Sequence, residues 1–324
     1  MNKCVPLAVI KQFGNEFPGI YNRFEDVDGD VSFTSKDLQT ILSHGTDMQD
    51  YWSTVEVIKT CHLWRKFKQE YRFDPDLEEM ILEQDSLMDS KLPTKVLESI
   101  PFQSVFVQTS RFAVKGLNAF AGFFATVHKS QNKNRLFFCP VYASGNVCGI
   151  LGIEFSDLTL GETIKMTFDN YQNMLKDNGV KDEKAADESY YSDMCRMMNQ
   201  MLQLLLYICA ANTEKEADPE HEKMFRPAKG KIRDQYKEVK IWNVGKETGA
   251  IIRNMKHSTG SRHSVAHTGS HTPKRTHIRK GHYHHYWKGP RKGERQLILN
   301  WVAPTIINGA SEDIPLTITK IGNV

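Results

Sequence analysis

The chain has 324 residues, of which 40% are hydrophobic and 25% charged, and its net charge is +3. This length predicts one or two domains, and this composition is ordinary for a soluble globular protein. The longest apolar run, MLQLLLYICAA at residues 201–211, is about half as long as a bilayer-spanning helix, and the N-terminus lacks a signal-peptide pattern. We therefore expect a cytoplasmic protein that makes no membrane contact.

The charge is unevenly distributed. The segment Lys223–Arg295 contains 19 Lys and Arg but only four acids, a net charge of +15, so the remaining residues carry −12. Eight of the twelve histidines fall within residues 257–285. Clustered cations gain free energy by displacing counterions from phosphates, so this segment predicts contact with a polyanion or an acidic surface. A solvated basic face without a partner is the alternative.

The six cysteines are scattered and none has CxxC spacing, so we expect buried free thiols in a reducing compartment. The sequence DVDGD at residues 26–30 resembles part of a calcium loop. With Gly29 at the turn position, however, Phe24 and Ser35 stand at the first and last ligand positions, and neither supplies a carboxylate. We expect a turn here, no metal and no cofactor.

Residues 1–91 are predicted to be mainly helical, with few strand signals. Apolar residues at helical spacing predict helices at Ser35–Ser43, Tyr51–Tyr71 and Asp74–Met88. Residues 92–222 begin with aromatic and β-branched runs and end with two long amphipathic stretches. The predicted strands are Ser104–Thr109, Phe120–His128, Leu136–Tyr142 and Cys148–Phe155, and the predicted helices are Leu160–Leu175 and Tyr190–Ala211.

Residues 223–324 form a basic, histidine-rich region. Its predicted elements are a strand at Val239–Val244, a helix at Gly245–Asn254, and strands at His277–Trp287 and Gln296–Val302. Lys256–His271 is rich in Ser, Thr, Gly and His and is expected to be a mobile loop. The patterns together predict an α+β fold with a helical N-terminal part, a mostly antiparallel sheet covered by helices, and a basic β-rich C-terminal portion.

The stretch HIRKGHYHHYWKGP at residues 277–290 contains four histidines, three cations, two tyrosines and a tryptophan. If it is one strand, its side chains alternate between two faces. One face then holds Arg279, Gly281, Tyr283, His285 and Trp287, and the other holds Lys280, His282, His284 and Tyr286.

Two kinds of chemistry fit the histidines. His282 and His284 can share a metal, but zinc needs a third protein ligand, and no Cys, Asp or Glu lies near in sequence. Alternatively, the same two imidazoles can act as acid and base in metal-free RNA cleavage, with Arg279 stabilising the developing phosphorane charge. We therefore take His282, His284 and Arg279 as the catalytic candidates, should the protein be an enzyme.

Adhesion is a third interpretation. Arginine, histidine and aromatic side chains stack on bases or hold acidic peptides, with Arg275, Arg279, Arg291 and Arg295 meeting phosphate or carboxylate. Simple packing is the fourth, because aromatic residues on strands more often belong to a core than to a contact surface. The residue types leave these interpretations open.

The same stretch, followed by LNWVAPTIIN at residues 299–308, resembles the C-terminal signature of the second described family of type V-A anti-CRISPR proteins. The matching residues are His277, Arg279, Lys280, Gly281, His282, Tyr283, His284, Tyr286, Trp287, Gly289, Trp301, Pro304 and Asn308. Weaker upstream likenesses comprise Trp64, Arg65, Tyr71 and Asp74, and then Trp242, Val244, Gly245, Gly249 and Arg253. Thr276 stands where the family usually has proline, and Lys280 and Tyr283 replace arginine and tryptophan.

The resemblance implies suppression of effector nuclease production rather than inhibition of the finished nuclease. Family members are understood to recognise the effector's N-terminal peptide during translation, after which its mRNA is lost. The implied partners are that peptide, the mRNA or translating ribosome, and a host nuclease if one is recruited. We expect an adaptor rather than an enzyme, and the alternatives are a histidine-dependent ribonuclease or a mobile-element RNA-binding regulator with another target.

Contact residues are expected in the basic segment and beside it. They are Arg275, His277, Arg279, Lys280, His282, His284, Tyr286, Trp287, Trp242, Arg253 and Trp301.

Overall fold

The computed structural model describes residues 4–27, 30–33, 35–43, 48–91, 94–110, 119–129, 134–177, 188–218, 239–260, 277–290, 292 and 295–307. A seven-stranded sheet with the order β7-β6-β5-β4-β3-β9-β8 forms its centre. In sheet order the strands are β7 (Leu151–Glu154), β6 (Arg135–Tyr142), β5 (Phe120–His128), β4 (Ser104–Gln108), β3 (Gln69–Phe73), β9 (Lys240–Val244) and β8 (Lys215–Ala217).

Most pairs in this sheet are antiparallel. Strands β4 to β7 form an antiparallel meander, as the aromatic and β-branched runs predict, and β8 is antiparallel to β9. Strand β3 is parallel to both of its neighbours, β4 and β9. The α+β prediction is therefore confirmed. The three sequence regions 1–91, 92–222 and 223–324 each contribute to this one sheet.

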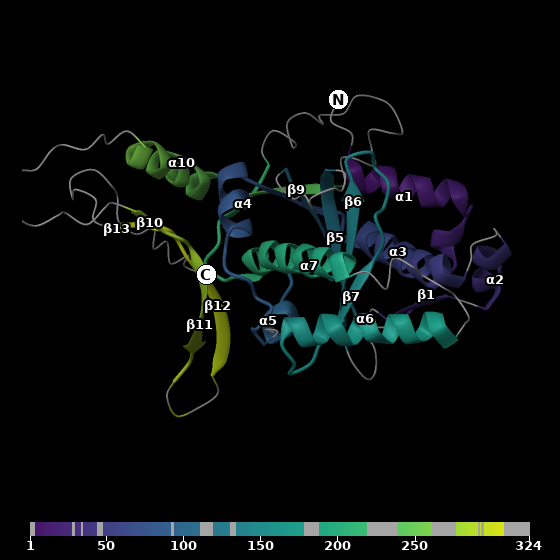
Figure 1. The fold of residues 1–324 in the computed structure, drawn as a ribbon. Coiled ribbons are helices and arrows are strands. Elements are labelled where there is room, and N and C mark those ends of the chain that lie inside the picture. Colours follow the sequence, from purple (N-terminus) through teal and green to yellow (C-terminus); the bar gives the residue numbers. More distant parts are fainter. Residues whose placement is uncertain are drawn as a thin grey trace, which may run out of the picture.

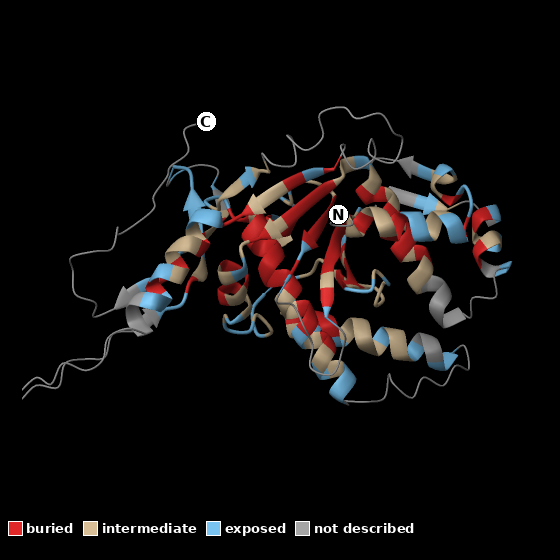
Figure 2. Cartoon of the chain, turned by 90° about the horizontal axis from the view of Figure 1, so that it is seen from above, coloured by how far each residue is buried: buried red, intermediate tan, exposed pale blue. Residues whose placement is uncertain are grey.

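Helices cover both faces of the sheet (Figure 1). Helices α1 (Val5–Glu16) and α3 (Met48–Phe67) pack on one face, where Cys61 and Trp64 meet Phe106 and Phe124. The other face is covered by α4 (Pro75–Leu82), α5 (Thr94–Leu97), α6 (Leu160–Asp177) and α7 (Glu188–Cys209). The C-terminal half of α7 is apolar nearly all round and is accordingly buried in the core (Figure 2).

The predicted helix Tyr51–Tyr71 is wrong at its C-terminal end. Helix α3 ends at Phe67, and Lys68 adopts a left-handed backbone conformation with φ of 48°. The chain then enters β3, whose amides bond to β4 and β9 instead of continuing the helix. Apolar residues recur at helical spacing up to Tyr71, so the periodicity alone hides this boundary.

The N-terminal part also contains two strands that its sequence does not predict. After α1 come the short helix η1 (Ile20–Asn22), strands β1 (Phe24–Val27) and β2 (Asp30–Phe33), and helix α2 (Ser35–Ser43). Strands β1 and β2 form a separate antiparallel pair. A small core joins this part to α3 through Phe17, Ile20, Ile41, Val55 and Ile58.

The C-terminal portion contains helix α10 (Lys246–Gly260) and two further antiparallel pairs. Strand β10 (His277–Arg279) pairs with β13 (Thr305–Ile307), and β11 (His282–Lys288) pairs with β12 (Gln296–Val302). The predicted single strand His277–Trp287 is therefore wrong. The predicted loop is helical up to Gly260, and its residues 261–271 lie outside the described ranges.

All six cysteines lie in the described ranges, and all are free thiols. Cys61 and Cys139 are buried, while the other four are half-buried. None of the helices in the described ranges combines the length and low polarity that crossing a bilayer requires.

Candidate contact surface

We use the term ribbon for the antiparallel pair of β11 and β12, which projects from the body of the protein (Figure 1). Opposite residues in an antiparallel pair share a face, and successive residues alternate. Tyr283 lies opposite Trp301, and His285 lies opposite Leu299. His284 and Tyr286 share the other face, with ring centroids 4.5 Å apart. Within β11 the predicted alternation is therefore confirmed.

The inner face anchors the ribbon in the core. Trp301 is only 5% exposed and packs edge-on against Tyr207 and Tyr283, with ring centroids 5.4 and 5.1 Å away. The Tyr283 hydroxyl donates to the main-chain carbonyl of Gln203 at 2.5 Å. Burial raises the pKa of Tyr283 well above its usual value, so this donor stays protonated. The sequence predicts Trp301 as a contact residue; the structure places its ring in the core, beneath the exposed part of the ribbon.

Polar contacts clamp β12 to the end of α7. The Asn212 side-chain amide donates to the Trp301 carbonyl at 2.7 Å and accepts from the Trp301 amide at 2.7 Å. The Ala211 amide donates to the Leu299 carbonyl at 2.9 Å. These bonds satisfy main-chain groups that a ribbon with only two strands would otherwise leave unpaired.

Gly281 explains why the predicted strand is interrupted. A Cβ atom at this position would lie 2.3 Å from the Trp301 indole, so the backbone comes as close to the ring as only glycine allows. On the partner strand, Pro304 falls between β12 and β13 and has no amide hydrogen for a ladder. The break between β10 and β11 therefore lies beside the break between β12 and β13.

The outer part of the ribbon exposes aromatic and charged side chains. Trp287 is 61% exposed and Tyr286 is 43% exposed, the only other exposed large apolar residues in the described ranges being Leu158 and Tyr190. Lys288, Lys292 and Arg295 are exposed beside them. An exposed tryptophan next to cations suits stacking on bases or on a peptide, and it costs solvation free energy when nothing covers it.

The histidines of β11 differ in environment. His282 is half-buried, whereas His284 and His285 are exposed. Burial and the nearby His284 lower the pKa of His285. His282 and His284 are two residues apart, so their Cα atoms are separated by about 7 Å along the strand. Nowhere in the described ranges do three His, Cys, Asp or Glu side chains gather as a metal site.

The cations before the ribbon have separate positions. Arg279 is exposed on β10. Lys280 follows that strand and donates to the main-chain carbonyl of Glu83 at 2.7 Å, which ties the connection between β10 and β11 to the residue that caps α4. His277 pairs with Ile307 in the ladder, but its side chain lies outside the description, as does all of Arg275.

The other two predicted contact residues are engaged within the body. Arg253 on α10 bonds to both oxygens of Asp74 at 3.0 Å and to Asp76 at 2.6 Å. Although burial alone would raise it, hydrogen bonds from Arg253 and Lys256 keep the pKa of Asp76 below its usual value. Asp74 also caps α4 by accepting from the Asp76 amide. This network holds α10 against α4.

Trp242 lies on β9 rather than beside the ribbon. Its ring stacks on Tyr71 at an interplanar angle of 12°, and its indole donates to the Gln69 side chain at 2.8 Å. The Lys240 amine lies 4.2 Å from the centre of the same ring. The upstream residues that resemble the family therefore contact one another in the fold. Tyr71 on β3 packs on Trp242 on β9, and Asp74 at the start of α4 binds Arg253 on α10.

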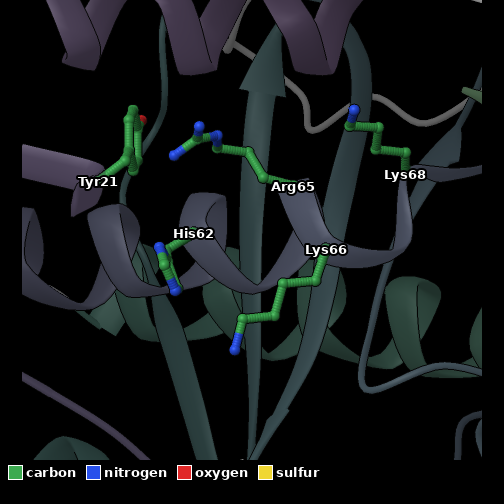
Figure 3. A pocket seen from close by; sticks show the side chains of 5 residues that line it. All are labelled: Tyr21, His62, Arg65, Lys66 and Lys68. Atoms are coloured by element: carbon green, nitrogen blue, oxygen red, sulfur yellow. The ribbon is translucent and has the colours of Figure 1, made fainter. Parts of the chain in front are cut away.

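One basic pocket was not predicted from the sequence. It has a volume of about 280 Å³ and is lined by Tyr21, His62, Arg65, Lys66 and Lys68 (Figure 3). The sequence contains a pattern from which this pocket could have been predicted. In HLWRKFK at residues 62–68, His62, Arg65 and Lys66 stand at positions i, i+3 and i+4, which lie on one face of a helix.

Comparison with known proteins identifies related sequences and folds. Residues 71–309 match the model of the AcrVA2-like family, described as the anti-CRISPR type V subtype A2 family. Among solved structures, the crystal structure of AcrVA2 aligns with a TM-score of 0.53 and 17% sequence identity, over 94% of this chain and 99% of that chain. At this identity the structural likeness shows a shared fold. A comparison with curated proteins finds no match.

Proposed function

The chain belongs to the anti-CRISPR type V subtype A2 family, and from that premise we propose that it suppresses synthesis of a type V-A effector nuclease. In this proposal it recognises the effector's N-terminal peptide during translation, and the effector mRNA is then lost. The ribbon is the contact surface. Its partners are the nascent peptide and the mRNA or translating ribosome that carries it.

One observation carries the proposal. The ribbon lies within the family match and presents Tyr286 and Trp287 to solvent beside three exposed cations, while Tyr283, Leu299 and Trp301 hold it on the core. Rigid aromatic side chains beside cations are favoured where a protein binds another macromolecule, because little conformational entropy is lost on binding. Because its inner half is anchored in the core, the ribbon holds its exposed aromatic side chains in fixed positions before a partner binds.

Charge suggests how the two partners are divided. The basic segment 223–295 suits RNA or the ribosome, and the rest of the chain, with a net charge of −12, suits the peptide. Neutral replacements of the exposed cations Arg279, Lys288, Lys292 and Arg295 should abolish transcript loss while peptide binding persists. Loss of peptide binding instead would reject this division.

An adaptor role fits the histidines better than ribonuclease chemistry. Within the described ranges, neither the His282 nor the His284 imidazole has a hydrogen-bond partner that would fix its tautomer as acid or base. Purified protein incubated with effector transcript, with and without chelator, should leave the RNA intact. Cleavage that is lost in His282→Ala would establish a ribonuclease, and chelator-sensitive cleavage would establish a metal enzyme.

Co-expression with a tagged type V-A effector tests the proposal as a whole. Effector protein and transcript should both fall, and synonymous recoding of the first codons should not restore them, because the peptide is unchanged. Replacing the encoded N-terminal residues should restore both. If recoding alone restores the transcript, the chain reads RNA sequence. Salt-dependent RNA binding with no effect of effector peptide would favour an RNA-binding regulator with another target.

A further inference from the structure

The two edges of the ribbon differ, and the body of the protein closes one of them. On the edge of β12, the Trp301 amide donates to the Asn212 side chain, and the Leu299 carbonyl accepts from the Ala211 amide. The main-chain groups of Trp301 and Leu299 therefore point away from β11, toward the end of α7. Helix α5 also lies against β12, and Figure 1 shows β11 on the far side of β12 from α5.

The edge of β11 is open. In an antiparallel pair, opposite residues either bond to each other or both point outward, and these two cases alternate along the strands. Because Trp301 and Leu299 point outward, so do the residues opposite them, Tyr283 and His285, and Trp287 follows by alternation. Within the described ranges the outward N–H and C=O groups of these three residues have no hydrogen-bond partner. His285 and Trp287 are exposed, so a further strand can reach this edge.

The devices that usually protect an open strand edge are missing from β11. Such edges are commonly blocked by proline, by charged side chains or by a bulge. The strand HYHHYWK contains no proline, its one lysine is Lys288 at the end, and its register with β12 is regular. His284 and Tyr286 lie on one face, and His285 and Trp287 lie on the other. Alternate side chains of an added strand would therefore contact rings on both faces.

We propose that the effector's N-terminal peptide binds as a third strand on the edge of β11. This inference rests on the proposed function, in which the chain recognises that peptide, and it specifies the place and the manner of binding. A peptide that is still being translated has free main-chain donors and acceptors, so it can pair without first unfolding. Main-chain bonds supply affinity in this mode of binding, and the rings beside the edge select the side chains.

Charges at the two ends of the ribbon determine the direction of the peptide. At the base, the Glu83 carbonyl accepts from the connection between β10 and β11, and the Glu83 and Asp85 side chains are exposed. At the tip, the exposed cations are Lys288, Lys292 and Arg295. The positive amino end of the peptide therefore lies at the base, toward the acidic remainder of the chain. The end that continues into the ribosome lies at the tip, where cations suit RNA. The peptide thus runs parallel to β11.

A second copy of the chain is a poorer partner for this edge. Pairing of β11 with β11 of another copy would bring together two basic segments, each with a net charge of +15. Like charges on neighbouring strands destabilise the pairing, and a single peptide strand avoids this repulsion.

A synthetic peptide with the effector's N-terminal sequence tests the inference without any change to the protein. In a series of such peptides, a methyl group replaces the main-chain N–H hydrogen at each position in turn. An added strand donates toward β11 at every second residue. Methylation should therefore weaken binding about tenfold or more at alternate positions and have little effect between them. The dissociation constant from fluorescence anisotropy measures this pattern.

His285→Pro tests the edge from the side of the protein. Proline removes the outward amide hydrogen but no bond to β12, because the main-chain groups of His285 point outward. This variant should weaken binding about tenfold or more, whereas the matched control His285→Ala should bind as the original protein does. In the original protein, the peptide should slow hydrogen exchange of the Trp287 amide more than that of the paired Tyr286 amide. A spin label on the peptide's amino end should broaden the amide resonance of Gly281 more than that of Lys288.

The outcomes separate this inference from the proposed function. If the peptide binds but methylation has no alternating effect, the edge is not the site, although peptide recognition stands. Equal binding by His285→Pro and His285→Ala has the same meaning, and the methylated peptides decide the question if His285→Pro does not fold. If the peptide does not bind at all, peptide recognition fails and the inference fails with it. A dimer that dissociates in His285→Pro would assign the edge to a second copy, and stronger broadening at Lys288 would overturn the parallel direction.

Discussion

The Tyr283 hydroxyl donates to the main-chain carbonyl of Gln203 at 2.5 Å, and this bond links the ribbon to the buried C-terminal half of α7. Four residues further along the same strand, Trp287 is 61% exposed. A single strand therefore has a buried end that determines position and an exposed end available for contact. Stability and function should respond separately to substitutions at the two ends.

Substitution at the buried end should destabilise the fold. Trp301→Ala should cost about 3–5 kcal/mol of unfolding free energy, because it removes a large ring that contacts Tyr207 and Tyr283. Trp287→Ala should change it by less than about 0.5 kcal/mol, because that ring is largely solvated. Urea denaturation of the two variants measures the difference. Equal losses would show that the ribbon is not anchored through Trp301.

Gly249→Ala sets two opposing effects against each other. Alanine in a helix gains about 1 kcal/mol over glycine. A Cβ atom here would lie 2.0 Å from the Asp74 carboxylate, however, and that carboxylate is held by Arg253 and by the Asp76 amide. We expect the clash to win, with a net loss of about 1–2 kcal/mol in chemical denaturation. A net gain would mean that the network between α4 and α10 is loose.

Lys68→Gly should stabilise the protein. The left-handed conformation of Lys68 costs a non-glycine residue about 1–2 kcal/mol, which glycine would not lose. Glycine has more conformational freedom in the unfolded chain, and the entropy that it loses on folding offsets part of this gain. A net gain of roughly 0.5 kcal/mol should be measurable as a higher midpoint of denaturation. Lys68→Ala keeps the Cβ atom and serves as the control, since it removes the charge without relieving the backbone. If Lys68→Gly and Lys68→Ala are equally stable, the left-handed backbone at this position is not strained.

His62 should make the protein sensitive to acid. Its pKa falls from 6.5 to about 4 on folding, mainly through burial and then through Arg65. Below pH 6.5 the unfolded chain therefore binds a proton that the native state does not, and stability falls as the pH drops from 6.5 toward 4. His62→Gln should lose less stability over that interval. Parallel stability curves for the two proteins would show that His62 titrates normally.

The sequence contains enough information to predict the meander of β4 to β7 and the buried helix α7, because their apolar patterns have one dominant period. It does not locate the end of α3, since Trp64 and Tyr71 keep helical spacing across the boundary and a lysine occupies the left-handed position. It cannot place β3 between β4 and β9, because both parallel pairings join distant segments.

The candidate site shows the same limits. The alternation within β11 follows from sequence, but the break at Gly281 depends on the Trp301 ring, which approaches from another strand. Arg253 and Trp242 have the residue types of a contact surface, yet their partners are Asp74 and Gln69, far away in sequence. Only folding determines which cations are already engaged.

The most direct test of the ribbon as a contact surface is the effector transcript level during co-expression with the double variant Tyr286→Ala and Trp287→Ala. Tyr190→Ala is the matched control, because Tyr190 is also an exposed aromatic residue, 46% exposed, but lies on α7. We expect the double variant to fold with unchanged stability and to leave the transcript intact, while the control still depletes it. Full depletion of the transcript by the stable double variant would contradict the account.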